Sequence, residues 1–210
     1  LWLHPPGTSK LAQGVTTEVT GNCGFSAFPL RRESRTAALA HLAGIGDDPV
    51  DPPWHDLDSY AVAMEDRGIG VNIAPLAGHG ALRIAAGADR PGPADPDRLS
   101  RVLEQVLEQG AFGVSTGLTY APSAYADAGE LEVLCRTVAA FDALYATHGR
   151  SDILAGIDEI ASVGERTGAR LQYSHLAINH PDRGGTADQV VGRLEAARAR
   201  GVDSAGDVYP

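Results

Sequence analysis

Short apolar runs rich in β-branched residues alternate along the chain with longer amphipathic segments. Each short run ends in glycine or polar residues, which is typical of a strand that opens into a loop. The alternation predicts a strand followed by a helix, repeated along the chain. The strand candidates lie in residues 14–24, 71–80, 111–120, 143–150, 169–177 and 202–210.

The segments between these runs carry helix signals. Apolar residues fall on one face at a period of about 3.6 residues. They are Leu99, Val102, Leu103, Val106 and Leu107 in one segment, and Ile153, Leu154, Ile157, Ile160 and Ala161 in another. Capping residues mark the helix starts and glycine marks the helix ends. The start signals are Asp95 before Pro96, Asp127 with Glu130, and Thr186 with Gln189, and the stop signals are Gly110, Gly168 and Gly201.

The spacing of the strand ends predicts how these units are arranged. Thr116 lies 32 residues before His148, His148 lies 27 residues before His175, and His175 lies 32 residues before Asp207. Intervals of this size are typical of a strand, a crossover helix and the next parallel strand. The units are therefore expected to form one parallel sheet.

The interval from Cys23 to His79 is longer, at 56 residues, and contains a polar stretch with several prolines. We interpret residues 31–55 as an insertion over the mouth of the fold. A variable surface loop would produce the same pattern.

The predicted fold class is α/β, a (β/α)8 TIM-type barrel that is incomplete. A closed barrel needs eight strands and about 250 residues, whereas this chain has 210 residues and six strand candidates. We therefore interpret residues 1–210 as one partial barrel domain that holds about strands 2 to 7. A doubly wound sheet would tolerate six strands, but it would carry a G-x-G-x-x-G turn after its first strand. The run GNCGF at residues 21–25 lacks that pattern.

The amino-acid composition indicates which classes of protein this chain can belong to. The chain is 43% hydrophobic and 21% charged with a formal net charge of -10, which is typical of a globular protein and argues against nucleic-acid binding. No apolar run approaches the roughly 20 residues of a membrane helix, and the first residues do not resemble a signal peptide. We expect no membrane association and a cytoplasmic location. Cys23 and Cys135 are too few for a disulfide framework, so each thiol is buried filler or a chemical group.

Four side chains with metal-binding chemistry stand at predicted strand ends: Cys23, His79, His148 and His175. Taken singly, such a cysteine is most often a small buried side chain, and such a histidine is most often hydrogen-bonded scaffold. His148 and His175 end adjacent parallel strands, however, so both imidazoles can reach one point above the sheet. A thiolate from a nearby strand would complete a set suited to Zn²⁺. We therefore predict Cys23, His148 and His175 as metal ligands, and His79 as scaffold.

Several short sequence motifs occur in a fixed order along nearly the whole chain. They are SKLAQGVTTEV at 9–19, GNCGFS at 21–26, NIAPL at 72–76, GHG at 78–80, STGL at 115–118, YATH at 145–148, SHL at 174–176 and DVYP at 207–210. This set resembles the D-aminoacylase (N-acyl-D-amino-acid deacylase) family of the amidohydrolase superfamily. The resemblance implies a barrel of the metal-dependent hydrolase type. It also implies a zinc-dependent hydrolase that splits N-acyl-D-amino acids into a carboxylate and a D-amino acid.

The resemblance further implies roles for individual residues. It makes Cys23, His148 and His175 the zinc ligands. It makes Tyr120 a contact for the substrate's carboxylate or the developing oxyanion, although an aromatic ring that only packs at the mouth is the alternative.

The chain departs from the family pattern in three places. The superfamily's first strand ends in His-x-His, and no such pair occurs in these 210 residues. The family's general-base aspartate ends the last barrel strand, whereas Asp207 by strand count ends the seventh, so we expect the general base outside this chain. Ala177 stands where well-known members have lysine after Ser-His-Leu, which leaves the identity of the substrate open.

Two hypotheses of different classes follow. In the first, the chain is an internal fragment of an active zinc deacylase whose partner is a small-molecule N-acyl-D-amino acid. In the second, it is a truncated, inactive remnant that at most binds metal. Among enzymes, a dihydroorotase- or hydantoinase-like cyclic amidohydrolase is the nearest competitor. Such enzymes usually bridge two metals with a carboxylated lysine, and the only lysine here, Lys10, precedes the first predicted strand.

Overall fold

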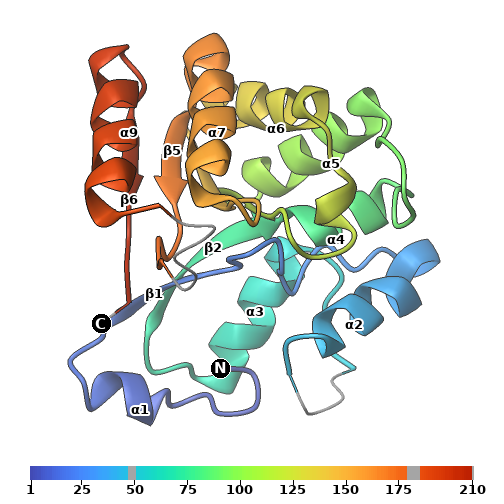
Figure 1. Ribbon diagram of the computed structural model, residues 1–210. Coiled ribbons are helices and arrows are strands. Elements are labelled where there is room, and N and C mark those ends of the chain that lie inside the picture. Colours follow the sequence, from blue (N-terminus) through green and yellow to red (C-terminus); the bar gives the residue numbers. More distant parts are fainter. Residues whose placement is uncertain (47–50, 179–184, 210) are drawn as a thin grey trace.

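One curled parallel sheet forms the centre of the computed structural model, which describes residues 1–46, 51–178 and 185–209 (Figure 1). Every neighbouring pair of strands is parallel, and the order across the sheet is the order along the chain. The strands are β1 (Thr17–Thr20), β2 (Asn72–Gly78), β3 (Gly113–Gly117), β4 (Leu144–His148), β5 (Arg170–Tyr173) and β6 (Ser204–Gly206). Each falls within one of the predicted runs.

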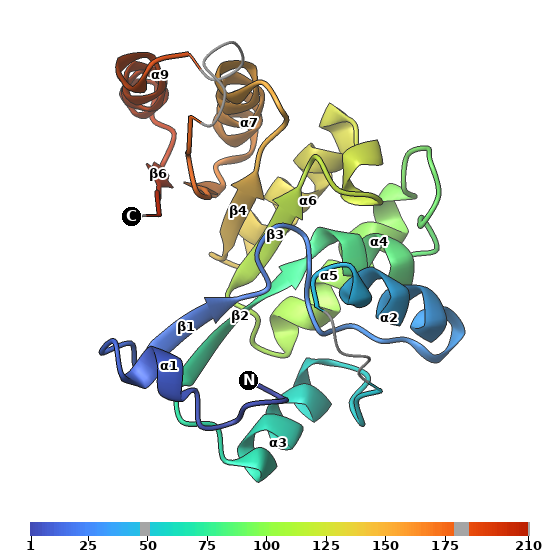
Figure 2. The ribbon, with the colours of Figure 1, turned by 60° about the horizontal axis from the view of Figure 1, so that its bottom comes forward.

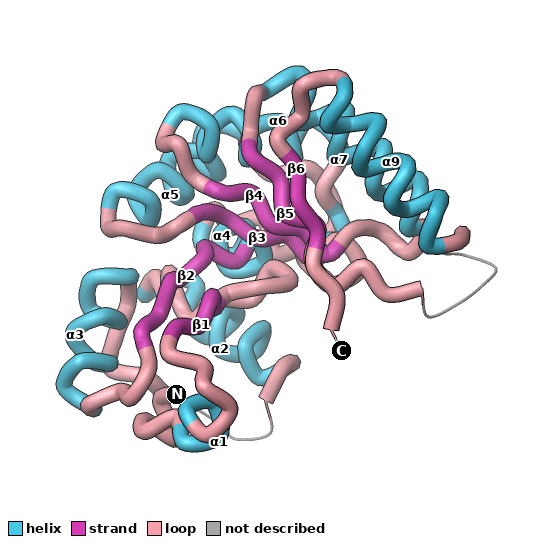
Figure 3. Tube along the Cα trace, turned by 90° about the vertical axis from the view of Figure 1, so that its left-hand side faces the viewer, coloured by secondary structure: helices cyan, strands magenta, loops and turns pink. Residues whose placement is uncertain are grey.

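Helices follow the strands and cover the outer side of the curl, as Figure 3 shows. The longer helices are α2 (Arg35–Ala43), α3 (Leu57–Arg67), α5 (Pro96–Glu108), α6 (Ala128–Ala140), α7 (Ile153–Thr167) and α9 (Ala187–Ala199). The short ones are α1 (Thr8–Leu11), α4 (His79–Ala85) and the 3-10 turns η1 (Arg32–Ser34) and η2 (Ser123–Tyr125). The arrangement confirms an incomplete TIM-type barrel. In the described part of the chain, no helix is both long enough and apolar enough to cross a membrane.

The predicted apolar faces lie against the sheet. All five apolar residues predicted for the face of α5 are buried. In α7, Ile157, Ile160 and Ala161 are buried, whereas Ile153 and Leu154 in the first turn are only half-buried. The core therefore lies between the sheet and its outer helices, which leaves the strand ends open for a site.

The capping signals are mostly confirmed. Asp95 accepts a hydrogen bond from the amide of Arg98, with proline at the first helical position, and Thr186 and Gln189 form both bonds of a capping box. One prediction is wrong. Asp127 caps α6, but the side chain of Glu130 turns away from it into the core. Helix α4, which begins directly after β2, was not predicted.

The segment interpreted as an insertion contains η1 and α2, and residues 47–50 within it lie outside the described residues. Helix α2 lies against α4 (Figure 2). The imidazole of His41 in α2 stacks on Phe25, with ring centroids 4.3 Å apart, so α2 contacts the loop that follows β1. That the segment is an insertion over the barrel mouth remains a prediction.

Candidate metal centre

Cys23 lies in a tight turn directly after β1. Its φ is +55°, a left-handed conformation that non-glycine residues rarely adopt. Gly21 and Gly24 on either side also have positive φ, at +85° and +80°. The glycines therefore let the chain reverse sharply on both sides of the half-buried thiol.

His148 and His175 come from the two strands that the sequence predicted. His148 is the last residue of β4, and Thr147 pairs with Tyr173 at the end of β5, so the two strand ends are level. His175 has a left-handed φ of +39°. The Oδ1 atom of Asp207, just after β6, accepts a hydrogen bond of 2.7 Å from the amide of His175.

Asp207 therefore holds the backbone of a candidate ligand. Sequence reasoning considered this residue only as a weak candidate for the general base. The role of Asp207 follows from the register of β5 and β6, which the sequence did not reveal. Tyr173 pairs with Gly206, and this pairing places Asp207 beside the turn after β5.

The three predicted ligands meet at one point. Cys23 Sγ lies 3.2 Å from His175 Nε2 and 3.9 Å from His148 Nδ1, and the two nitrogens are 3.1 Å apart. Around a tetrahedral zinc ion, a sulfur and a nitrogen ligand would be about 3.6 Å apart and two nitrogens about 3.3 Å apart, from bond lengths of about 2.3 and 2.0–2.1 Å. The donor types and their spacing fit zinc. No other such group of three ligands occurs among the described residues.

The protonation of the cluster without metal follows from its surroundings. Burial raises the pKa of the Cys23 thiol, and the charge of Asp207 raises it further. Burial and the neighbouring His175 lower the pKa of His148, which favours neutral imidazole. His148 Nε2 lies 3.0 Å from Thr119 Oγ1. With the proton on Nε2, this bond leaves the lone pair of Nδ1 directed at the other two ligands.

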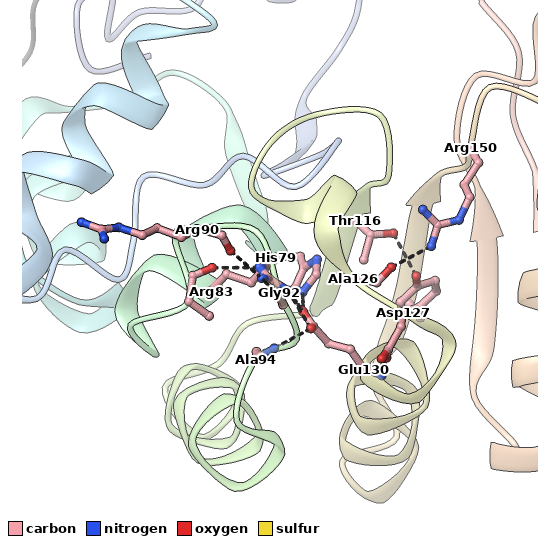
Figure 4. A network of polar contacts seen from close by, with 12 residues as sticks. His79, Arg83, Arg90, Gly92, Ala94, Thr116, Ala126, Asp127, Glu130 and Arg150 are labelled. Atoms are coloured by element: carbon pink, nitrogen blue, oxygen red, sulfur yellow. Dashed lines mark hydrogen bonds and ion pairs between the residues drawn. The ribbon is translucent and has the colours of Figure 1, made fainter.

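A cleft of about 390 Å³ opens beside these ligands. Its lining includes His148, His175, Arg150 and Tyr209. Arg150 was not singled out from the sequence, although it follows His148 by two residues. Its Nε donates to Glu159 Oε2 at 2.9 Å. A terminal nitrogen donates to the carbonyl oxygen of Ala126 at 2.8 Å, as Figure 4 shows. The cleft has the volume of a small-molecule site.

The predicted substrate contact Tyr120 lies at the same end of the sheet. Its side chain is half-exposed, and its ring centroid is 4.9 Å from that of His148 and 5.6 Å from that of Phe25. The ring therefore lies next to a candidate ligand.

His79 lies outside the cluster, as the scaffold prediction expected. Its imidazole is fully buried at the start of α4, and its Nε2 donates to Glu130 Oε1 at 2.8 Å. Figure 4 shows Arg83, His79 and the amide of Ala94 converging on the carboxylate of Glu130. Burial lowers the pKa of His79, which keeps it neutral. Arg83 therefore carries the charge that balances Glu130.

Glu130 is the most strongly perturbed carboxylate that the structure describes. Burial alone would raise its pKa, but the hydrogen bond and proximity of His79, the amide of Ala94 and the guanidinium of Arg83 bring the pKa down to about 2. The network ties α4 to α6.

No family model matches the chain, but several curated proteins and solved structures are similar to it. The chain is 38% identical to an N-acyl-D-glutamate deacylase of Alcaligenes xylosoxydans xylosoxydans, over 100% of this chain and 43% of the relative. It is 32% identical to a D-aminoacylase of the same organism, over 97% of this chain and 42% of the relative. The chain thus spans less than half the length of these curated relatives.

Two solved structures share the fold. One is the N-acyl-D-glutamate deacylase of Bordetella bronchiseptica, complexed with zinc and a phosphonate that mimics the tetrahedral intermediate. It matches 96% of this chain and 43% of its own with a TM-score of 0.85 at 35% identity. A D-aminoacylase matches 100% of this chain and 44% of its own with a TM-score of 0.89 at 30% identity. The chain is therefore a homologue of proteins named D-aminoacylase and N-acyl-D-glutamate deacylase, over about 43% of their length.

Proposed function

We propose that this chain is the central part of a zinc-dependent enzyme that hydrolyses N-acyl-D-amino acids to a carboxylate and a D-amino acid. The observation that carries the proposal is the convergence of Cys23, His148 and His175, whose ligand atoms lie 3.1–3.9 Å apart at the mouth of the curled sheet. Relatives named as deacylases match the whole of this chain, and one of the solved relatives was complexed with zinc and a mimic of the intermediate of amide hydrolysis.

The three side chains have distinct parts in holding the metal. Cys23 supplies a thiolate from the turn after β1, and the two imidazoles approach from β4 and β5. When His148 carries its proton on Nε2 and donates it to Thr119 Oγ1, the lone pair of Nδ1 is available to the metal. Zinc bound in such a site lowers the pKa of water toward about 7 and polarises a carbonyl, which is what amide hydrolysis requires.

The cleft beside the ligands would receive the substrate. We place the acyl amide next to the three ligands and the α-carboxylate within reach of Tyr120, whose ring contacts that of His148. The guanidinium of Arg150 is paired with Glu159. Arg150 therefore shapes the wall of the cleft, and its positive charge is largely balanced by Glu159. We place the general base and the His-x-His pair outside these 210 residues. The two free cysteines fit a reducing compartment, so we place the protein in the cytoplasm.

Replacing Cys23 by alanine tests the ligand assignment. In the full-length protein, Cys23→Ala should lower bound zinc by about one ion per chain, because the two imidazoles that remain in this cluster make an incomplete zinc site. Cys135→Ala is the matched control, since burial raises the pKa of that thiol to about 12 and it lies in α6. Zinc is measured by elemental analysis after gel filtration, and undiminished zinc in Cys23→Ala would refute the assignment.

The reaction is tested separately with N-acetyl derivatives of D-glutamate, D-aspartate and D-methionine and their L enantiomers. Release of the free D-amino acid, lost in Cys23→Ala and kept in Cys135→Ala, is the expected result. A zinc-loaded, folded full-length protein that releases no amino acid from any of these amides would exclude the deacylase and favour the inactive remnant.

A further inference from the structure

Ser115 touches both ends of the turn that carries Cys23. The residue lies in the middle of β3 and is fully buried. Its Oγ accepts a hydrogen bond of 3.0 Å from the amide of Gly24 and donates a short one to the carbonyl oxygen of Gly21. One hydroxyl thus uses its donor and an acceptor lone pair to span the residues on either side of Cys23.

The turn needs such a restraint because its conformation is unfavourable. A left-handed φ at a non-glycine residue such as Cys23 costs on the order of 1 kcal/mol or more and persists only when neighbours fix it. The peptide of Gly24 is held on its other side too, since its carbonyl oxygen accepts from the amide of Gly80 at 2.9 Å and lies 3.3 Å from His41 Nε2. On the side that faces β3, the hydroxyl of Ser115 restrains the turn through its bonds to Gly21 and Gly24.

We propose that Ser115 is a positioning residue for the metal site: it fixes the turn so that the sulfur of Cys23 is directed at His148 and His175 before any metal binds. The inference rests on the proposed function, because it presumes that these three side chains hold zinc. Residues that orient metal ligands typically contribute about 10–100-fold to metal affinity, and Ser115 acts on the ligand through the backbone on both sides of it.

The alternative is that Ser115 only satisfies buried polar groups. The next residue in β3 provides a matched comparison. Thr116 is also fully buried, and its hydroxyl bonds to Tyr145 Oη at 2.9 Å and to Thr147 Oγ1 at 2.8 Å, on the other face of the strand. Removal of either hydroxyl breaks two hydrogen bonds, but only Ser115 contacts the Cys23 turn.

The test compares zinc affinity in full-length Ser115→Ala and Thr116→Val. Zinc is titrated against a chelator of known affinity, after zinc binding by the unchanged protein and its loss in Cys23→Ala have been established. We expect Ser115→Ala to bind zinc about 10–100-fold more weakly and Thr116→Val to stay within about 2-fold, although both lose stability. In the cobalt-loaded protein, the thiolate-to-cobalt charge-transfer band should change in Ser115→Ala and stay unchanged in Thr116→Val.

Zinc affinity of folded Ser115→Ala equal to that of the unchanged protein would overturn the role of Ser115 while leaving the zinc site intact. An equal loss in both variants would also overturn it, because the effect would then follow stability alone.

A second measurement needs no variant and no metal, so it decides the matter even if Ser115→Ala does not fold. In the metal-free protein, the Gly24 amide should exchange its hydrogen far more slowly than the unbonded amides of nearby exposed loops, since Ser115 holds it. Exchange of the Gly24 amide at the rate of an exposed loop would show that the turn is not held in advance, and would overturn the proposal.

Discussion

Replacing Glu130 by glutamine is expected to lower the free energy of unfolding of the full-length protein by about 3–5 kcal/mol, the usual cost of removing one partner of a buried ion pair. The side chain of Arg83 is 0% exposed and that of Glu130 is 3% exposed. Both carboxylate oxygens accept from the guanidinium, at 2.5 and 2.6 Å. Because His79 is neutral, an amide at position 130 would leave the charge of Arg83 buried without a counter-charge.

The pH dependence provides an independent signature of the same carboxylate. Its pKa is about 2 in the folded protein against an ordinary value of 4.5, so its ionisation favours the folded state. That contribution is fully present above pH 4.5 and is lost as the pH falls toward 2. At about 1.4 kcal/mol per pKa unit it amounts to at most about 3.5 kcal/mol, less where solvent screens the pair. The difference in stability between the unchanged protein and Glu130→Gln should therefore shrink across this range.

Glu132→Gln is the matched control. Glu132 lies two residues further along α6 and also pairs with arginines, Arg136 and Arg166, but at the surface, where ion pairs contribute little. Urea unfolding of both variants, followed by circular dichroism from pH 7 to pH 2.5, measures the two effects. Equal losses in Glu130→Gln and Glu132→Gln at pH 7 would contradict the special role given to the buried carboxylate.

Replacing Gly117 by alanine is expected to abolish most zinc binding at the proposed site while leaving the protein folded. A methyl group at Gly117 would fall on the carbonyl oxygen of Cys23 and lie 2.7 Å from a ring carbon of Tyr120. The clash is with backbone atoms, which cannot rotate aside as a flexible side chain can. The Cys23 turn must therefore move away from β3. Overpacking of this kind costs about 1–3 kcal/mol, and displacement of a ligand should weaken zinc binding by about 100-fold or more.

Gly149→Ala controls for an added methyl group beside the site. Gly149 directly follows His148, yet a methyl group there would meet nothing within 4 Å. This variant should keep its zinc and change the free energy of unfolding by no more than about 0.5 kcal/mol. Zinc content and urea unfolding are measured for both variants, and zinc retained by Gly117→Ala would show that the turn is not packed against β3 as described.

The sequence was sufficient for the sheet and for the three converging side chains, because both depend on local pattern. Each apolar run is short and ends in polar residues, and a histidine at the end of such a run must lie at the mouth of a parallel sheet. The interval between His148 and His175 makes them neighbours. Cys23 could be added only through its place after the first strand and the family resemblance.

The residues that support the candidate ligands could not be predicted, because their partners are distant in the chain. Ser115 bonds across 91 and 94 residues to the Cys23 turn, and Asp207 bonds across 32 to His175. Glu130 shows how a local pattern misleads. Its spacing from Asp127 predicted a capping box, but a buried guanidinium 47 residues away binds a carboxylate more strongly than a backbone amide at a helix start does.

The curl of the sheet has a consequence for how the site and the fold depend on each other. In a flat sheet the ends of β1 and β5, four strand positions apart, would be separated by roughly 19 Å at about 4.8 Å per strand. Cys23 Sγ and His175 Nε2 are only 3.2 Å apart, because the curl of the sheet brings the ends of β1 and β5 toward each other. An ion held by Cys23, His148 and His175 would also join β1 to β4 and β5, strands with which β1 does not pair. It would close loops of 125 and 152 residues, a size at which a cross-link strongly restricts the unfolded chain. A metal bound at this site would therefore hold the two sides of the curled sheet together. A change that flattens the sheet should weaken metal binding, and loss of the metal should let the sheet flatten.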